Sequence, residues 1–359
     1  MRHLYSDYFA KFRAQATYDL ATSGVKDCEL ADLQLTWGDL ALSGPNASGY
    51  GPLMAILAAR FGVDRGCVVM PGGGASFANH LALAALVGPG DEVLVERPSY
   101  ELLTDTLHYL RADVRRFERR GDDGWALDPE TVVAALTPTT RLVVLTHLHN
   151  PSSAPASELA INAIAHAAER IGARVFIDET YRELTFLGGA AITSFRPGGS
   201  IITTSSLTKG YGLSGLRCGW ILADPPLAER MRRLNDLYGV APPHISERMA
   251  VVAFRRLPEL KARADALLGA NRAAYRALLA DHPALEQTVF DTGTTVFARV
   301  RDGDGDACAE RLLEAGVAVV PGRFFEAADH IRIGLGGDAE MTRAGLELAA
   351  RTLGQASSR

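Results

Sequence analysis

The sequence has little of what marks secreted, membrane-spanning or nucleic-acid-binding proteins. Its four cysteines, Cys28, Cys67, Cys218 and Cys308, stand far apart, without C-x-x-C spacing or nearby histidines that would indicate a metal site. There is no run of about 20 apolar residues, and the first residues alternate charge with aromatics, unlike a signal peptide. With 37 basic and 42 acidic residues, the chain lacks the positive excess that favours nucleic acid. These absences predict a cytoplasmic protein with no metal, no nucleic-acid partner and no membrane segment.

The stretch 205–220, SSLTKGYGLSGLRCGW, is the most informative part of the chain. Lys209 stands among hydroxyl side chains and glycines, and Arg217 follows eight residues later. Together they offer an amine nucleophile, donors for an anion and a permanent positive charge. This combination suits a phosphorylated aldehyde as ligand.

The same stretch contains the dinucleotide-binding pattern G-x-G-x-x-G at Gly210, Gly212 and Gly215. A true fingerprint of this kind opens a long helix. Here CGWILADPP follows, which predicts a strand ended by two prolines, so we disfavour the nucleotide interpretation.

Strand and helix patterns alternate through most of the chain, which predicts an α/β fold whose mostly parallel sheet is covered on both faces. The expected strands are 68–70, 92–96, 141–146, 174–177 and 201–204, and the expected helices are 52–61, the segment after 74, 99–111 and 157–171. Residues 1–20 predict an exposed helical arm. Helices over 245–279 and 308–315, with short strands at 294–300, 317–320 and 331–333, predict a smaller α/β domain.

Polar residues follow the expected strands, where ligands collect in parallel sheets. Asn150 follows one strand, Asp178 and Tyr181 follow the next, and Lys209 follows a third. The glycines at 72–74 precede a helix, where they either admit an anion to the helix N-terminus or only form a tight turn.

These residues match the needs of an aldehyde cofactor that carries a phosphate and a ring nitrogen. Lys209 can form a Schiff base, and an aspartate can keep the ring nitrogen protonated so that the ring accepts electrons. Tyr181 and Asn150 can donate to a ring oxygen. The phosphate donors expected here are Arg217, Ser206 and the turn at Gly73 and Gly74.

The ordered motifs Asn150-Pro151, Asp178 to Tyr181, Ser206 to Lys209 and Arg217 resemble those of fold-type I pyridoxal-phosphate enzymes, in particular the class I and II aminotransferases. The resemblance covers nearly the whole chain. It implies an aspartate aminotransferase-like, three-layer large domain at 45–250, with a small domain from 251–359 and part of the N-terminal segment 1–44. It also implies a homodimer.

By this resemblance Lys209, Asp178 and Tyr181 are catalytic, with Asp178 facing the ring nitrogen of pyridoxal 5'-phosphate. Tyr100 matches the aromatic that stacks on the ring, although Tyr109 and Tyr50 are competitors. The implied cofactor contacts are Gly73, Gly74, Ala75, Tyr100, Asn150, Asp178, Tyr181, Ser206, Lys209 and Arg217, and the implied substrate contacts are Gly24, Asn150 and Arg332.

The chain departs from the family pattern at three places. Gly44 stands where a tyrosine often reaches the partner's phosphate, and Asn46 or Tyr50 is the expected substitute. The usual glycine after Asn-Pro-Thr is replaced by Ser153. Where dicarboxylate-specific members carry an arginine, the chain has Asp236 and its neighbours, which favours a cationic or amine-bearing substrate.

The resemblance implies an aminotransferase that moves an amino group from an L-amino acid to a 2-oxo acid. The same cofactor also supports a lyase, cyclase or decarboxylase, and the sequence does not separate these. A non-catalytic sensor attached to a transcription regulator is disfavoured because no DNA-binding extension precedes the site region. His147 and His149 flank a strand end, and we interpret them as structural.

Overall fold

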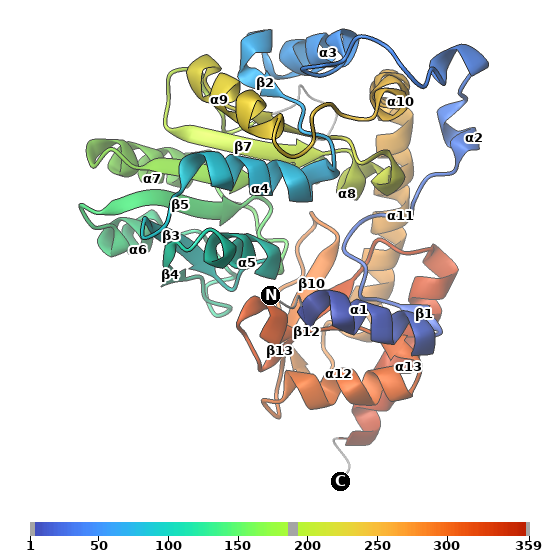
Figure 1. Cartoon of the computed structure of the whole chain (residues 1–359). Helices are drawn as coiled ribbons and strands as arrows, with labels where there is room; N and C mark the ends of the chain where they lie inside the picture. Colours follow the sequence, from blue (N-terminus) through green and yellow to red (C-terminus); the bar gives the residue numbers. More distant parts are fainter. Residues whose placement is uncertain (1–3, 186–192, 357–359) are drawn as a thin grey trace.

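The computed structural model describes residues 4–185 and 193–356, which form two α/β units (Figure 1). The larger unit is built on a seven-stranded sheet with the order β2-β8-β7-β6-β5-β3-β4. All neighbouring strands are parallel except β8, which is antiparallel to both β7 and β2. The strands are β2 (Val68–Val69), β3 (Glu92–Arg97), β4 (Asp113–Glu118), β5 (Thr140–Thr146), β6 (Arg174–Asp178), β7 (Ile201–Ser206) and β8 (Gly219–Leu222).

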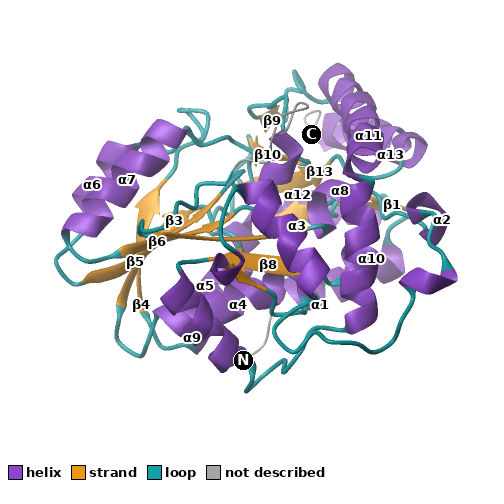
Figure 2. Ribbon diagram, turned by 90° about the horizontal axis from the view of Figure 1, so that it is seen from above, coloured by secondary structure: helices purple, strands orange, loops and turns teal. Residues whose placement is uncertain are grey.

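Helices cover both faces of this sheet, which confirms the expected three layers (Figure 2). Alternate strand residues point to opposite faces, so Val93 and Val95 pack on one layer while Leu94 packs on the other. The first layer contains α4 (Gly74–Leu86), α5 (Glu101–Tyr109) and α9 (Pro225–Asn235). The second contains α3 (Gly51–Phe61), α6 (Pro129–Ala135), α7 (Glu158–Arg170) and α10 (His244–Arg255).

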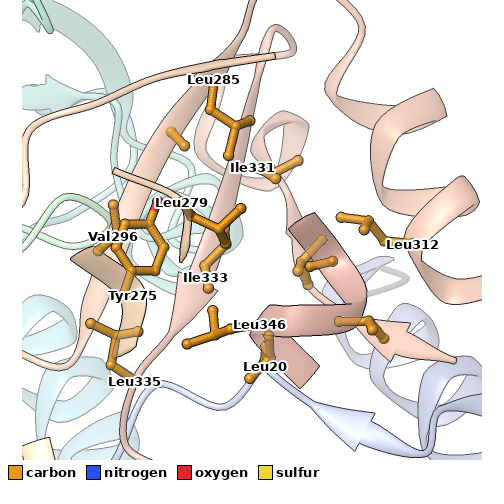
Figure 3. Close-up of a cluster of buried hydrophobic side chains, with 14 of the residues drawn as sticks. Leu20, Tyr275, Leu279, Leu285, Val296, Leu312, Ile331, Ile333, Leu335 and Leu346 are labelled. Atoms are coloured by element: carbon orange, nitrogen blue, oxygen red, sulfur yellow. The ribbon is translucent and has the colours of Figure 1, made fainter. Parts of the chain in front are cut away.

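The smaller unit has an antiparallel sheet with the order β12-β13-β10-β9. Its elements are α11 (Leu257–Leu278), β9 (Leu285–Glu286), β10 (Thr295–Val300), α12 (Gly305–Glu314), β11 (Val317–Ala318), β12 (Val320–Pro321), β13 (His330–Gly334) and α13 (Ala339–Ala356). The N-terminal strand β1 (Tyr18–Asp19) pairs in parallel with β11. Leu20 therefore packs beside Leu312 and Leu346 in one core (Figure 3), and both ends of the chain build this unit, as expected.

The N-terminal helix α1 (Leu4–Gln15) is not the exposed arm that the sequence predicts. Phe12 is 1% exposed, and its ring contacts Tyr8 and Phe9, while Tyr8 also contacts Phe324 of the small unit. Aromatic residues at 8, 9 and 12 share one side of a helix, on which Phe12 is buried and Tyr8 and Phe9 are partly buried. The arm is therefore part of the small unit's core.

The chain after β1 crosses to the carboxyl ends of the large sheet. Val25 N donates to Lys209 O at 3.0 Å, and Cys28 N donates to Gly212 O at 2.7 Å. These bonds fix the segment 23–28 beside the stretch that the sequence singles out.

Short elements complete the described chain. They are the helices α2 (Leu30–Leu33) and α8 (Thr208–Tyr211) and the 3-10 helices at Trp37–Asp39, Arg65–Cys67, Arg182–Thr185, Ser214–Leu216 and Gly322–Phe325. Within residues 4–185 and 193–356, none of the helices has both the length and the apolar character that crossing a membrane requires.

Candidate active site

A cavity of about 920 Å³ opens where the parallel strands of the large sheet end. Its lining includes eight of the residues predicted for the site: Gly24, Ala75, Tyr100, Asn150, Asp178, Tyr181, Lys209 and Arg217. Asp178 is the last residue of β6, and Asn150 follows the end of β5. The strand ends thus bring together residues that lie up to 193 positions apart, from Gly24 to Arg217.

Lys209 lies in the short helix α8, which begins two residues after β7 ends. Its amine Nζ donates to Ser23 Oγ at 2.9 Å, and a Cβ on Gly24 would approach Lys209 Cδ to 3.3 Å. The helix stops at Gly212, whose φ of 67° is left-handed, and a Cβ there would stand 2.3 Å from Lys26 O. No long helix follows the glycines, as the sequence predicts.

Asp178 is a buried carboxylate in the cavity wall. Its Oδ1 accepts from Thr180 N at 2.9 Å and from the Thr180 hydroxyl, and its Oδ2 accepts from Asn79 Nδ2 at 2.7 Å. Burial raises the pKa of Asp178, while these hydrogen bonds and the charge of Lys209 act to lower it. The donors therefore favour the ionised carboxylate in a setting that otherwise disfavours it.

The part of the cavity next to the N-terminus of α4 suits a phosphate. Ala75 and Ser76, in the first turn of α4, line it together with Arg217. Arg217 Nη2 donates to Gly73 O at 2.7 Å, and Gly74 N donates to Arg217 O at 2.7 Å. A Cβ on Gly74 would lie 2.8 Å from Arg217 Nη2, so glycine is needed for this approach. A helix N-terminus beside a guanidinium attracts an anion.

Four predicted residues are outside the cavity lining. Gly73 and Gly74 are hydrogen-bonded to Arg217, which itself lines the cavity. Ser206 is fully buried, its Oγ accepts from Thr208 N at 3.3 Å, and Thr208 lines the cavity in its place. Arg332 is likewise fully buried.

Arg332 lies directly behind Asn150. Its Nη1 donates to Asn150 Oδ1 at 3.1 Å and its Nη2 donates to Ala21 O at 3.1 Å. Its guanidinium also stacks 4.9 Å from the centre of the Phe325 ring. These two bonds use only two of the five N–H donors of the guanidinium, but Arg332 is fully buried, so a substrate carboxylate reaches it only if the groups that cover it move.

Sequence reasoning missed several polar residues of the lining, among them Ser23, Ser76, Asn79, Thr180 and Thr208. Asn79 left the clearest signal, because it is an amide among alanines and leucines, one helical turn after Ala75. Ser23 gave no signal beyond its place next to Gly24.

Other candidates lie elsewhere. Tyr50, Tyr109 and Asp236 are not in the lining, and the last two are exposed. His149 makes contacts with Ser152 Oγ at 2.7 Å and Pro98 O at 3.0 Å, and burial holds its pKa well below the usual value. This environment agrees with a structural role.

The donor set fits pyridoxal phosphate. The end formed by α4 and Arg217 suits the phosphate, buried Asp178 offers an acceptor for a ring N–H, and Lys209 offers a primary amine. Tyr100 supplies an aromatic side chain in the same cavity. Glycines at 24 and 74 leave room that a Cβ would fill.

Comparison with known proteins agrees with this geometry. Residues 42–350 match the family model described as aminotransferase class I and II. The arginine–pyruvate transaminase of Pseudomonas aeruginosa is 33% identical over 79% of this chain and 75% of its own, and the capreomycidine synthase of Streptomyces vinaceus is 30% identical over 97% and 92%.

Solved structures extend the likeness to three dimensions. A PLP-dependent aminotransferase from Streptococcus suis matches with a TM-score of 0.88 and 25% identity over 97% of both chains. A PLP-dependent cyclase matches with a TM-score of 0.87 and 26% identity, also over 97% of both chains. The chain therefore belongs to the class I and II aminotransferases, a family of pyridoxal-phosphate-dependent enzymes.

Proposed function

We propose that this enzyme moves an amino group from an L-amino acid to a 2-oxo acid, with Lys209 as the residue that holds the cofactor and carries the proton. The observation that supports this most directly is the placement of the Lys209 amine and the Asp178 carboxylate in one cavity wall. Bound pyridoxal phosphate supplies an aldehyde that condenses with amines, releasing water, and a ring that accepts electrons.

The chain's own residues take the remaining roles. Asp178 accepts the ring N–H and so keeps the ring protonated. The Lys209 amine, which lies beside Ser23, would take up and hold the α-proton of the donor. Arg332 and Asn150, which are hydrogen-bonded to each other, bind the α-carboxylate through their N–H groups.

Replacement of Lys209 tests this assignment. We expect Lys209→Ala to lose at least about 1000-fold in turnover, because both attachment and proton transfer need the amine. Lys11→Ala, at an exposed lysine of α1, is the matched lysine control and should keep normal turnover. Borohydride treatment followed by peptide mapping should label Lys209 in the wild type; near-normal turnover in Lys209→Ala would refute the assignment.

We further propose a donor with a cationic side chain. Asp236 was expected to select such a substrate, but it is exposed and outside the lining. Asp19, in contrast, lines the cavity. It lies near Arg332, because both side chains are hydrogen-bonded to the backbone of Ala21: Ala21 N donates to Asp19 Oδ1 at 2.8 Å, and Ala21 O accepts from Arg332. A carboxylate at Arg332 and a cation at Asp19 would thus bracket one substrate. The relative named arginine–pyruvate transaminase supports this class.

A donor panel checks this proposal. Arginine and lysine should be better donors than leucine or glutamate. Asp19→Asn should raise KM for arginine by about threefold, the scale of an exposed ion pair, and leave KM for leucine unchanged. Asp27→Asn, at another carboxylate of the lining, is the control. Equal KM values for arginine in Asp19→Asn and wild type would exclude Asp19 as the selecting residue.

Cyclisation is the second candidate reaction. It is supported by two of the relatives that span nearly the whole chain, one named a synthase and one titled a cyclase. Mass spectrometry of the products separates the alternatives: amino transfer requires a 2-oxo acid acceptor and yields the oxo acid of the donor. A donor converted to a cyclic product without any acceptor would favour cyclisation.

We also propose a homodimer. Large apolar side chains are exposed on the segments 37–42 and 237–240, namely Trp37, Leu42, Leu237, Tyr238 and Val240. The two segments lie close together, because Asn46 Nδ2 donates to Pro242 O at 2.6 Å. A Cβ on Gly72 would touch Pro242 at 3.3 Å, so this face adjoins the turn before α4. Light scattering should give about twice 38.4 kDa, and Leu237→Asp with Val240→Asp should give monomers.

A cytoplasmic location is supported by the cysteines. All four lie in described residues and are free thiols, three of them buried. Fractionation of cells that express the protein, with cytoplasmic and periplasmic marker enzymes, tests the location.

A further inference from the structure

Asn79 is a buried amide in the middle of α4, and its side chain connects residues of two neighbouring strands of the sheet, Asp178 of β6 and Thr204 of β7. Its side chain is in the cavity lining, and the residue is 4% exposed. Its Nδ2 donates to Asp178 Oδ2 at 2.7 Å, and its Oδ1 accepts from Thr204 Oγ1 at 2.5 Å. A continuous relay therefore runs from Thr204 through Asn79 to Asp178.

The direction of this relay is fixed by chemistry. An ionised carboxylate only accepts hydrogen bonds, so Asn79 has to present its amide N–H to Asp178. Its Oδ1 then faces Thr204, whose hydroxyl donates. Thr204 is fully buried and lies opposite Asp178 in the pairing of β6 with β7. Without this hydroxyl, nothing in the relay would prevent the amide from turning its oxygen towards the carboxylate.

The relay leaves one position on Asp178 open. A carboxylate accepts about four hydrogen bonds. Three are supplied by the protein: two from Thr180 to Oδ1 and one from Asn79 to Oδ2. The remaining position on Oδ2 is where a cofactor ring N–H is accepted in the proposed site.

We propose that Asn79 and Thr204 are positioning residues that hold Asp178 as an ionised acceptor for the ring nitrogen of the cofactor. This inference rests on the cofactor position of the proposed function. Asn79 of α4 and Thr204 of β7 lie outside the sequence motifs that contain Asn150, Asp178 and Lys209. Neither residue contacts the reacting carbon; both act through Asp178.

Nuclear magnetic resonance of the holoenzyme loaded with cofactor labelled with 15N in the ring tests the proposal. The wild type and Thr204→Ser, which keeps the hydroxyl, should show the resonance of a protonated ring nitrogen. Thr204→Val and Asn79→Leu should shift it towards the unprotonated position. Turnover should fall about ten- to hundredfold, the effect of losing a hydrogen bond to a charged group, with KM for the donor little changed.

Thr204→Val is the deciding variant, because it removes a single hydroxyl from a side chain of nearly the same shape. If Asn79→Leu does not fold, Thr204→Val still decides. A ring-nitrogen resonance in Thr204→Val identical to the wild type would overturn the proposal. A wild type that fails to transfer amino groups, combined with shifted resonances in the variants, would instead overturn the proposed function and leave the positioning role intact.

Discussion

At the scale of single residues, His147 is an imidazole held neutral in the protein interior. It follows the last residue of β5 and is 5% exposed. Burial is the main cause that lowers the pKa of His147 to about 3, and the charges of Arg182 and Arg119 act in the same direction. The protein therefore contains a histidine that takes up a proton far more readily when the chain unfolds.

This difference predicts a loss of stability in acid. The pKa of an unfolded histidine is about 6.5, so between that pH and about 3 the unfolded chain binds a proton that the folded chain does not. Stability from His147 is complete above about pH 6.5 and falls by up to about 1.4 kcal/mol for each pH unit below it. Urea unfolding at pH 7.5 and 5.5 measures this, and the loss should be about 1.4 kcal/mol smaller in His147→Gln. Equal losses in both proteins would contradict the prediction.

Ser153 marks a limit of sequence reasoning at this scale. The family's glycine is absent there, yet Ser153 adopts a left-handed φ of 66° that favours glycine. Its hydroxyl bonds to Thr295 Oγ1 at 2.9 Å and accepts from Thr295 N at 3.2 Å, across the two units. A partner 142 residues away is not visible from local sequence.

At the scale of elements, two glycines at helix ends can be compared: Gly74 is the first residue of α4, and Gly62 directly follows α3. Gly62 and Gly74 have similar left-handed φ values, 65° and 74°, but different surroundings. A Cβ on Gly62 meets nothing within 4 Å, whereas one on Gly74 meets the Arg217 guanidinium at 2.8 Å. Substitution at Gly62 therefore tests backbone strain alone, whereas substitution at Gly74 tests backbone strain together with the position of Arg217.

We expect Gly62→Ala and Gly74→Ala each to lower stability by about 1–2 kcal/mol, because alanine is strained in the left-handed region. Only Gly74→Ala should also weaken cofactor binding, since Arg217 has to move. Thermal unfolding and titration of the apoenzyme with pyridoxal phosphate measure the two effects. Equal cofactor affinities in the two variants would show that the Gly74 contact does not position Arg217.

Most long elements of the large unit were predictable because their signals are local. The apolar run at 141–146, the Ser157 cap and the strand before Lys209 lie within a few residues of where they were expected. The edge strand β4 was missed, since Asp113, Arg115 and Arg116 give it little apolar pattern. The site was predictable through its ordered motifs, whereas Asn79 and Ser23 act through partners in distant segments.

At the scale of the whole molecule, the N-terminal helix is a structural part of the small unit and a wall of the cavity. Phe9 lines the cavity and contacts the buried ring of Phe12, with 4.7 Å between ring centres. We therefore expect α1 to couple stability to substrate binding.

Phe12→Ala should destabilise the protein by about 3–5 kcal/mol, as for other large buried aromatics. It should also raise KM for the amino donor, because Phe9 loses its support. Lys11→Ala, on the exposed side of the same helix, is the control for both measurements. Unfolding curves and initial rates provide the readouts, and an unchanged KM with lowered stability would separate α1 from substrate binding.

The pairing of β1 with β11 has a consequence for the order in which the protein is made. Tyr18 leaves the ribosome 299 residues before its partner Val317. Domains fold as units during synthesis. The last strand of the large sheet ends at Leu222, so this sheet can form before β11, the partner of β1, has been made. Ser23 and Gly24 follow β1 directly and lie beside Lys209, so we expect a nascent chain to complete its active site only after Val317 has been made.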